Sequence, residues 1–588
     1  MNRLRTGVLV VLGLVLTAAS TPAGAQAGPA TAMGRGGAVA TVDRLATEAG
    51  VQALRRGGNA IDAAVTAAAV LGVTEPVSAG VGGGGFMVIR TADGRVTTID
   101  SRETAPLAMR PDSLHEEGRA LPFNDARYSG LSVGVPGTVA GWARALSTYG
   151  TMSLAQAVEP AMRIAQQGFV VDQPFFDQTQ QNLDWFDDLP ASARLFLDAD
   201  GTPRDIGTIF RNPEMARTYG LISQFGASGF YSIIAPYIVD AVRNPLVFPG
   251  ANHRWRPGVM TTADIERYVA PERPPTYVNY RGLDVYGMSP PSSGGSTVGE
   301  ALNILEGFDV AGSSSERARH LLLEASRYSF ADRNAYLADP DFFPVPLRGL
   351  LSDGFAAQRR SLITERAATS PVPPGDPYPF EATSSKAADA SASAVRTGST
   401  THVSATDRAG NMVSYTFTIE SLGGSGIVVP GFGFLLNNEL TAFTYDSLTH
   451  PNRVEGGKRP RSSMAPTIVL RDGAPLLVLG SPGGSMIITT VLQILVDRLD
   501  RGLSLPDAIA APRASQRNTA ATAAEPLFLV SPEAEALRQR GHTFTVTPEI
   551  GAANGIEVLA DGRVVAAAEP VRRGGGSAMV EVPGRSPG

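Results

Sequence analysis

Cysteine is absent from all 588 residues of the chain. A thiol nucleophile, a thiolate metal site and a disulfide are therefore excluded. Histidine is scarce, and its six residues show no helical pair spacing of the kind that binds a metal. We therefore predict no metal and no cofactor, and expect any chemistry to come from hydroxyl, carboxylate, imidazole or amine groups.

A basic excess is also lacking, since the formal net charge is −6. The protein has no excess of positive charge to attract a phosphate backbone, so nucleic acid is not an expected partner. The only long apolar run is near the start, from about residue 8 to 18, after Arg3 and Arg5 and before the small residues "AGAQA". That run is shorter than the ~20 residues a membrane span needs, so residues 1–27 are predicted to be a signal peptide and not an anchor. We expect an exported protein, periplasmic or extracellular.

Periodicity predicts an α+β protein in which helices cover sheets. Residues 41–73 read as two helices, "FMVIR" and "RVTTID" as a hairpin, and residues 138–167 as further helices. Between residues 364 and 399 Pro, Ser and Ala replace any apolar pattern, which is typical of a mobile linker. The part after it reads as mostly strands, including "GIVVPGFGFLLNN", with one strong helix at "MIITTVLQILVDRLDRG".

Two Gly-containing motifs are discounted. "GVGGGG", residues 80–85, matches a dinucleotide fingerprint but has a helix before it and a strand after it, the reverse of the required order. "GLSVG", around Ser132, matches a serine nucleophile elbow but lacks a strong preceding strand.

The stretch "GSTTHVSATDRAGNMVSYTFTIE" is more informative. A three-residue turn with Gly410 in the left-handed position would place Asp407 opposite Asn411, and Thr400 opposite Thr418. A Thr–Thr pair across two strands is also common for structural reasons alone.

The position of Thr400, directly after the predicted linker, favours chemistry over a purely structural pair. A threonine hydroxyl is a weak nucleophile, and cleavage of the Ser399–Thr400 bond would give it its own α-amino group as a base. "GSPGGS" ends a predicted strand and opens a helix, so Gly483 and Gly484 could offer N–H groups to an oxyanion. Gly-rich turns of this kind are also frequent as simple structural elements.

Taken with ordered blocks along almost the whole mature chain, these residues resemble the γ-glutamyltranspeptidases, which are self-processing N-terminal-nucleophile hydrolases. Among the blocks are "GGNAIDAAVTAAAVLGVTEP", "DSRETAP", "SPPSSGG", "FADRNAYLADPDF", "KRPRSSMAPTIV" and "GSPGGSMIITTVLQ". The resemblance implies a four-layer αββα sandwich. It also implies cleavage before Thr400 into a large fragment, residues 28–399, and a small catalytic fragment, residues 400–588, that form a heterodimer.

The resemblance also implies a role for each motif residue. Thr400 would be the nucleophile, Thr418 its supporting hydroxyl, and Gly483 with Gly484 the oxyanion hole. A substrate α-carboxylate would be held by a guanidinium fork and two hydroxyls, and an α-ammonium by two carboxylates. The residues expected in these two binding roles are Arg102, Ser462 and Ser463 for the carboxylate, and Glu420 and Glu439 for the ammonium.

Two departures from the family pattern affect specificity. The family has an Asp where this sequence has Ala442, so one charge-assisted contact to the ammonium, worth about 1.5–3 kcal/mol, is lost. Between Phe443 and Lys458 the segment is short, which predicts an open cleft.

The sequence therefore predicts a γ-glutamyl hydrolase or transferase that acts on glutathione and other small γ-glutamyl amides through a threonine acyl-enzyme, with hydrolysis favoured. One alternative is an acylase for glutaryl-type amides with weakened α-amino recognition. Another is a non-catalytic homologue that binds glutamyl compounds.

Overall fold

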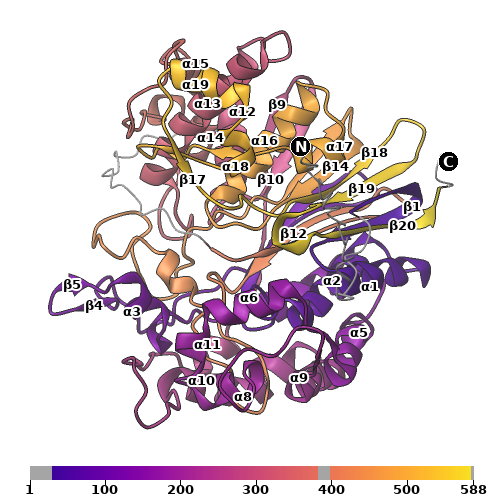
Figure 1. Cartoon of the computed structure of the whole chain (residues 1–588), viewed down its shortest axis with the longest axis vertical. Coiled ribbons are helices and arrows are strands. Elements are labelled where there is room, and N and C mark those ends of the chain that lie inside the picture. The colour runs from indigo at the N-terminus through magenta and orange to yellow at the C-terminus, as the bar shows by residue number, and fades with distance from the viewer. Residues whose placement is uncertain (1–29, 382–397, 585–588) are drawn as a thin grey trace, which may run out of the picture.

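The computed structural model describes residues 30–381 and 398–584 (Figure 1). The predicted signal peptide and most of the second half of the predicted linker lie outside the described residues. None of the described helices has the length and apolar character that crossing a bilayer requires.

One antiparallel sheet of thirteen strands runs through the protein. The long strand β1 (Thr31–Thr41) joins its two halves, because its start pairs with β19 and its later residues pair with β11. From edge to edge the strands are β8 (Glu272–Arg273), β3 (Val96–Asp100), β2 (Gly84–Arg90), β12 (Met412–Thr418), β11 (Thr401–Thr406), β1, β19 (Val564–Ala568), β18 (Asn554–Val558), β14 (Ala474–Gly480), β13 (Thr467–Arg471), β10 (Leu283–Gly287) and β9 (Thr276–Tyr280), with β20 (Ser577–Pro583) paired to β1.

The two halves of this sheet pack against each other, with β11 and β12 facing β14 and β18. Ser414 on β12 donates to the carbonyl oxygen of Leu479 on β14 at 2.9 Å. Asn554 on β18 donates to the carbonyl oxygen of His402 on β11, also at 2.9 Å. The strands that flank Thr400 and Thr418 are therefore held from a second layer of sheet.

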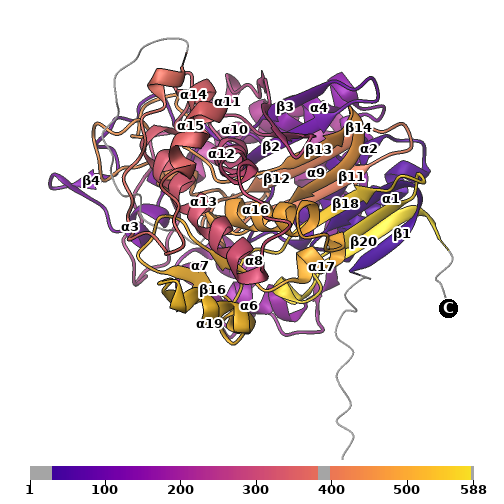
Figure 2. The same ribbon diagram turned by 90° about the horizontal axis from the view of Figure 1, so that it is seen from above.

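Helices cover both outer sides of the sheet (Figures 1 and 2). One group packs with β11 and β12 in one hydrophobic core, and the other packs with β13, β14 and β18 in a second core. The first group is α1 (Arg44–Arg55), α2 (Ala60–Thr74), α4 (Thr138–Tyr149), α5 (Leu154–Gln167), α9 (Pro213–Phe225) and α10 (Ala235–Arg243), and the second is α12 (Gly294–Glu306), α13 (Ser315–Tyr336), α16 (Met486–Leu499) and α17 (Leu505–Ala510).

Shorter elements lie around these layers. They include the helices α6 (Gln173–Gln181), α15 (Asp353–Arg360) and α19 (Pro532–Gln539), the strand pairs β4 (His115–Glu116) with β5 (Arg119–Ala120) and β6 (Phe169–Val170) with β7 (Ile209–Phe210), and the small sheet β15 (Ala514–Ser515), β16 (Thr522–Ala524) and β17 (Phe544–Val546).

Helix α2 is buried along its whole length, as expected for a helix that is apolar all round. It begins with a capping box in which Asn59 and Asp62 satisfy each other's backbone N–H groups. Asp407, in the turn between β11 and β12, accepts the N–H of Ala60 at 2.9 Å. The start of α2 is thus tied to the hairpin that carries the two threonines.

The predicted hairpin register is confirmed. Thr401 pairs with Phe417, which places Thr400 opposite Thr418, and Gly410 has a φ of 87°. The helices predicted at residues 41–73 and 138–167 and at "MIITTVLQILVDRLDRG", and the hairpin of β2 and β3, are also confirmed.

The strand predicted at "GIVVPGFGFLLNN" is wrong. This segment is a loop with a single bridge between Val428 and Leu435, and it turns at Gly431 and Gly433, both with positive φ. The start of the predicted linker is anchored and not free: the N–H of Val372 donates to Asn518 at 2.7 Å, and the N–H of Ala368 donates to Glu324 at 3.0 Å.

Replacing Asp62 by Ala should destabilise the protein. Its carboxylate accepts the N–H of Asn59 at 2.7 Å, the N–H of Met152 at 2.9 Å and the hydroxyl of Thr151 at 2.7 Å. We expect Asp62→Ala to lower the free energy of unfolding by about 3 kcal/mol, measured by thermal or urea unfolding. Glu48→Gln, which breaks an exposed ion pair in α1, is the control and should change it by less than about 0.5 kcal/mol. Equal effects of the two changes would contradict this account.

Candidate active site

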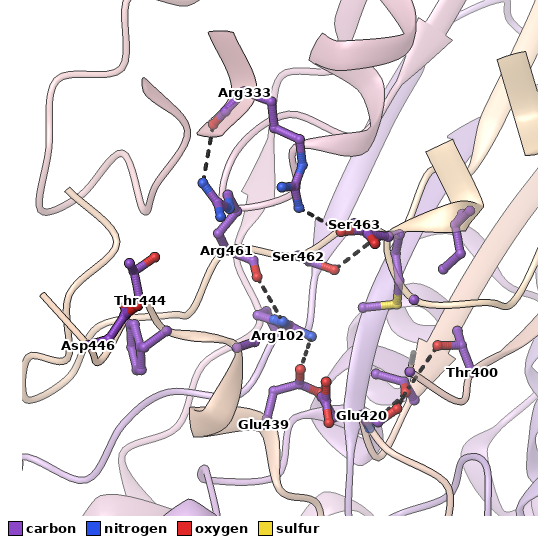
Figure 3. A pocket seen from close by; sticks show the side chains of 18 residues that line it. Arg102, Arg333, Thr400, Glu420, Glu439, Thr444, Asp446, Arg461, Ser462 and Ser463 are labelled. Atoms are coloured by element: carbon purple, nitrogen blue, oxygen red, sulfur yellow. Dashed lines mark hydrogen bonds and ion pairs between the residues drawn. The ribbon is translucent and has the colours of Figure 1, made fainter. Parts of the chain in front are cut away.

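A pocket opens at the ends of β11 and β12, and most of the predicted site residues line it (Figure 3). Gly483 and Ser399 are the predicted residues that do not line it. Its wall is formed by Arg102, Arg333, Gly398, Thr400, Thr418, Glu420, Glu439, Ala442, Phe443, Thr444, Asp446, Arg461, Ser462, Ser463, Met464, Gly484, Ser485 and Ile487.

Two threonine hydroxyls meet at the carbonyl oxygen of Ser399. Thr418 Oγ1 donates to this oxygen at 2.5 Å, and Thr400 Oγ1 lies 2.7 Å from it. The two hydroxyl oxygens are 3.3 Å apart, and Thr400 is only 4% exposed. The carbonyl of the Ser399–Thr400 peptide bond is therefore polarised next to a hydroxyl that could attack it.

Glu420 fixes this arrangement through its backbone. Its N–H donates to Thr418 Oγ1 at 2.8 Å, and its carbonyl oxygen accepts the N–H of Ser399 at 2.7 Å. Glu420 has a φ of 79°, which is uncommon for a non-glycine residue and costs of order 1 kcal/mol or more. The strained turn aligns the hydroxyl of Thr418 with the carbonyl of Ser399.

Two residues that sequence analysis missed, Arg573 and Ser78, also hold this backbone. Arg573 donates to the carbonyl oxygen of Thr400 at 2.7 Å and also binds Glu75 and Ser78, each at 2.7 Å. Ser78 also accepts the hydroxyl of Ser399 at 2.9 Å. Burial raises the pKa of Glu75, although the positive charge of Arg573 opposes the rise.

The glycine turn after β14 lies beside this backbone. A Cβ atom added to Gly398 would lie 3.2 Å from the Cα of Gly484. Gly483 and Gly484 have φ values of 128° and 58°, which favour glycine, and neither N–H donates a hydrogen bond to any described residue. Two backbone donors thus stand free at the turn.

At the closed end of the pocket Arg102 is already paired. Its Nη1 lies 2.6 Å from Glu439 Oε1, and its other nitrogens donate to the carbonyl oxygens of Pro460 and Arg461. Burial raises the pKa of Glu439 to about 7 against the pull of Arg102, and the charge of Glu420 adds to the rise. Burial and the charge of Glu439 also raise the pKa of Glu103, a buried neighbour of Arg102, well above its ordinary value.

The two predicted serines differ in their surroundings. Ser462 is buried, and its hydroxyl oxygen accepts the N–H of Met464 at 3.1 Å. Ser463 is half-buried, and its hydroxyl oxygen accepts from Arg333 Nη2 at 2.7 Å (Figure 3). Arg333 lies within the quoted block "FADRNAYLADPDF", but nothing in that block indicated that its side chain reaches the pocket.

The departures from the family pattern also lie at the pocket. Ala442 lines the pocket, so the carboxylate that the family has at this position is absent from the pocket wall. Asp446 lines it as well and is exposed, which the sequence alone could not show. The short segment after Phe443 thus still contributes a charged side chain to the pocket.

A second group of titratable residues lies elsewhere. His320, Glu324 and His542 come together in the fold although their sequence spacing gave no sign of it, and they could in principle hold a metal ion. However, His320 Nδ1 is 2.8 Å from His542 Nε2, and His320 Nε2 is 2.7 Å from the carbonyl oxygen of Thr364. A pair of neutral imidazoles accounts for both contacts, and burial lowers the pKa of both rings.

A buried threonine hydroxyl beside a polarised peptide carbonyl is typical of N-terminal-nucleophile hydrolases. The family model of γ-glutamyltranspeptidase matches residues 46–579, and the chain belongs to this family. It is 39% identical over 491 residues to the glutathione hydrolase proenzyme of Bacillus subtilis (strain 168), covering 82% of this chain and 81% of that protein.

Acylases are similar to the chain as well. It is 35% identical over 552 residues to the acylase ACY 1 proenzyme of Pseudomonas sp. (strain SE83), covering 91% of this chain and 92% of that protein. The solved structure of cephalosporin acylase from Bacillus halodurans superposes with a TM-score of 0.81 at 28% identity, covering 97% of this chain and 99% of that one.

Thr400→Ala should abolish self-cleavage, because it removes the hydroxyl next to the Ser399 carbonyl. We expect a single full-length band on a denaturing gel, where the unchanged protein gives two fragments. Thr401→Ala is the matched control, since the hydroxyl of this neighbouring buried threonine has no hydrogen-bond partner among the described residues. Cleavage of Thr400→Ala at the unchanged rate would contradict the assignment.

Proposed function

We propose that this protein is a self-processing γ-glutamyl hydrolase and transferase that acts on glutathione and other γ-glutamyl amides. The observation that carries the proposal is the meeting of Thr400 and Thr418 at the Ser399 carbonyl, beside a turn with free N–H groups. The relatives named glutathione hydrolase support the substrate class.

Self-cleavage follows from the same contacts. Thr400 Oγ1 attacks the carbonyl carbon of Ser399, while Thr418 stabilises the charge on the carbonyl oxygen. The C–N bond then breaks, its nitrogen takes up the hydroxyl proton, and the acyl group remains on Thr400 as an ester. Water hydrolyses this ester, which frees the carboxylate of Ser399 and the α-amino group of Thr400.

The freed amino group then serves as the base in turnover. It takes the proton from Thr400 Oγ1 as this oxygen attacks the γ-amide, and the N–H groups of Gly483 and Gly484 stabilise the oxyanion. The amine leaves with the proton, and the acyl-enzyme passes its acyl group to water or to an acceptor amine. Hydrolysis is favoured because the pocket is open to solvent at Asp446.

The closed end of the pocket supplies recognition of the glutamyl group. Arg102 with the hydroxyls of Ser462 and Ser463 would hold the α-carboxylate. Glu439 and Glu420 would receive the α-ammonium. Glu439 presents a buried carboxyl group to the pocket, so an ammonium would give it a second positive partner beside Arg102.

We also propose how the layers are arranged, that the two fragments stay together, and that the protein is exported. The two packed sheet halves with helices outside fit a four-layer αββα N-terminal-nucleophile sandwich, formed by both fragments, residues 28–399 and 400–588. The fragments would remain together as a heterodimer, because β11 lies between β1 and β12 and thus joins both fragments in one sheet. Export, to the periplasm or the medium, rests on residues 1–27.

A second candidate is an acylase for glutaryl-type amides, which have no α-amino group. Ala442 on the pocket wall favours it, because the ammonium has one carboxylate fewer to bind. The likeness to acylase ACY 1 and to cephalosporin acylase is consistent with it. A non-catalytic homologue is disfavoured, since both hydroxyls and the glycine turn are in place.

The two candidates are separated by kcat/KM on a γ-glutamyl anilide and on the matching glutaryl anilide. We expect the γ-glutamyl substrate to be preferred at least tenfold. Ala442→Asp should raise this ratio a further ten- to a hundred-fold, as about 1.5–3 kcal/mol of charge-assisted binding predicts. Ala442→Asn, which introduces a side chain of the same shape as Asp but without the charge, should not. A preference for glutaryl anilide in the unchanged enzyme would favour the acylase.

Recognition of the ammonium should depend on pH. The raised pKa of Glu439 means that its carboxylate is charged above about pH 7 and neutral below it, so ammonium binding weakens as the pH falls. The ratio of kcat/KM for γ-glutamyl over glutaryl anilide should therefore fall below about pH 7. Titration of the Thr400 amine affects both substrates and cancels in this ratio. Glu439→Gln should flatten the profile, and a flat profile in the unchanged enzyme would refute the role of Glu439.

A further inference from the structure

Two buried arginines each donate a hydrogen bond to a serine hydroxyl of the pocket wall. Arg333 on α13 donates from Nη2 to Ser463 Oγ at 2.7 Å, and Arg517, just after β15, donates from Nη1 to Ser485 Oγ at 2.6 Å. Their exposed fractions are 7% and 6%. Neither guanidinium has an ion pair with a carboxylate among the described residues, and Nε of Arg517 lacks a hydrogen-bond partner there.

A buried guanidinium without a counter-charge is costly, because it has lost hydration and gained no opposite charge. Burial lowers the pKa of Arg517 to about 10. The pKa of Arg333 is lowered well below its ordinary value by burial and by the positive charges of Arg461 and Arg517. A bound anion would reduce this cost for both side chains.

The two serines connect these arginines to the pocket through hydrogen bonds. An arginine can only donate, so Ser463 Oγ and Ser485 Oγ are acceptors in these bonds and each keeps its own proton for another partner. Both serines line the pocket and are half-buried. The wall thus offers two hydroxyl donors backed by two cations, which is suited to a carboxylate.

The location of these donors indicates which part of a substrate they meet. Arg102 and Glu439, 2% and 1% exposed, mark the closed end where the acyl group would lie. Ser463 and Ser485 also line the pocket but are more exposed than these two side chains, and Ser485 directly follows Gly484. Thr400 is only 4% exposed, so an anion bound by these two more exposed hydroxyls would lie nearer to solvent than Thr400, where the leaving group of the amide would extend.

We infer that Arg333 and Arg517, through Ser463 and Ser485, form a second anion subsite that binds a carboxylate of the leaving group. The inference rests on the proposed function, and it names the preferred substrates as γ-glutamyl amides whose amine part is an α-amino acid or short peptide with a free carboxylate. Ser463 also belongs to the proposed α-carboxylate site, so the two subsites would share its hydroxyl.

The test compares γ-glutamylglycine with γ-glutamylglycinamide, which differ only in the charge of the terminal group. We expect kcat/KM to favour the acid by about tenfold in the unchanged enzyme, mainly through a lower KM. Arg517→Gln should remove most of this preference by weakening the acid alone, and Arg517→Lys should restore part of it. Ser485→Ala, which removes the hydroxyl and keeps Arg517, should reduce the preference as well.

Arg194→Gln is the matched control, since it makes the same change in net charge at an exposed ion pair of helix α8 (Pro190–Phe196). It should leave the ratio unchanged. All variants are first checked for two fragments on a denaturing gel. Equal kcat/KM for the two substrates in the unchanged enzyme, or an equal loss on both in Arg517→Gln, would overturn the subsite. The proposed function would still stand in that case, because γ-glutamylglycinamide would still be cleaved. Failure to cleave either substrate would overturn both.

Discussion

The proposed catalytic centre depends on the register in which β11 pairs with β12. Because Thr401 lies opposite Phe417, Thr400 and Thr418 lie side by side, and both hydroxyls reach the carbonyl oxygen of Ser399. A slip by one residue would turn one hydroxyl to the other face of the sheet. Three features secure the register: the hairpin turn at Gly410, the contact of Asp407 with the start of α2, and the packing of Ser414 against β14.

The charges around this centre are divided by position. At the closed end, two buried carboxyl groups share the single guanidinium of Arg102, and burial raises the pKa of both. Arg333 and Arg517, which donate to Ser463 and Ser485, have no carboxylate partner among the described residues. An acyl group with an ammonium and a leaving group with a carboxylate would match this division, which is the electrostatic basis of the proposed specificity.

Local patterns predicted the local parts of the structure. The period of apolar residues gave α2 and α16, and turn chemistry gave the hairpin register, because each depends on residues close in sequence. The segment around Val428 looked like a strand from its composition, but Pro430 and two glycines with positive φ make it a loop. The hairpin register and the glycine turn indicated the threonines and the oxyanion donors, and the resemblance to a family supplied the substrate-binding residues. All of these residues but Gly483 and Ser399 line one pocket.

Contacts between distant segments could not be read from the sequence. Arg573 lies 173 positions after Thr400, and Arg517 meets Ser485 only because the segment after β15 folds back onto the start of α16. Likewise Asp446 reaches the pocket through the course of a loop that has no periodic pattern. These contacts could be identified only from the three-dimensional arrangement, because no single block of sequence contains both partners.

The most direct test of the central claim is the intact mass of the small fragment, measured before and after a brief reaction with a γ-glutamyl anilide. The account predicts a fragment that begins at Thr400 and gains the mass of one glutamyl acyl group on that residue. A fragment that begins elsewhere, or an acyl group located on another residue by peptide mapping, would contradict the assignment of Thr400 as the nucleophile.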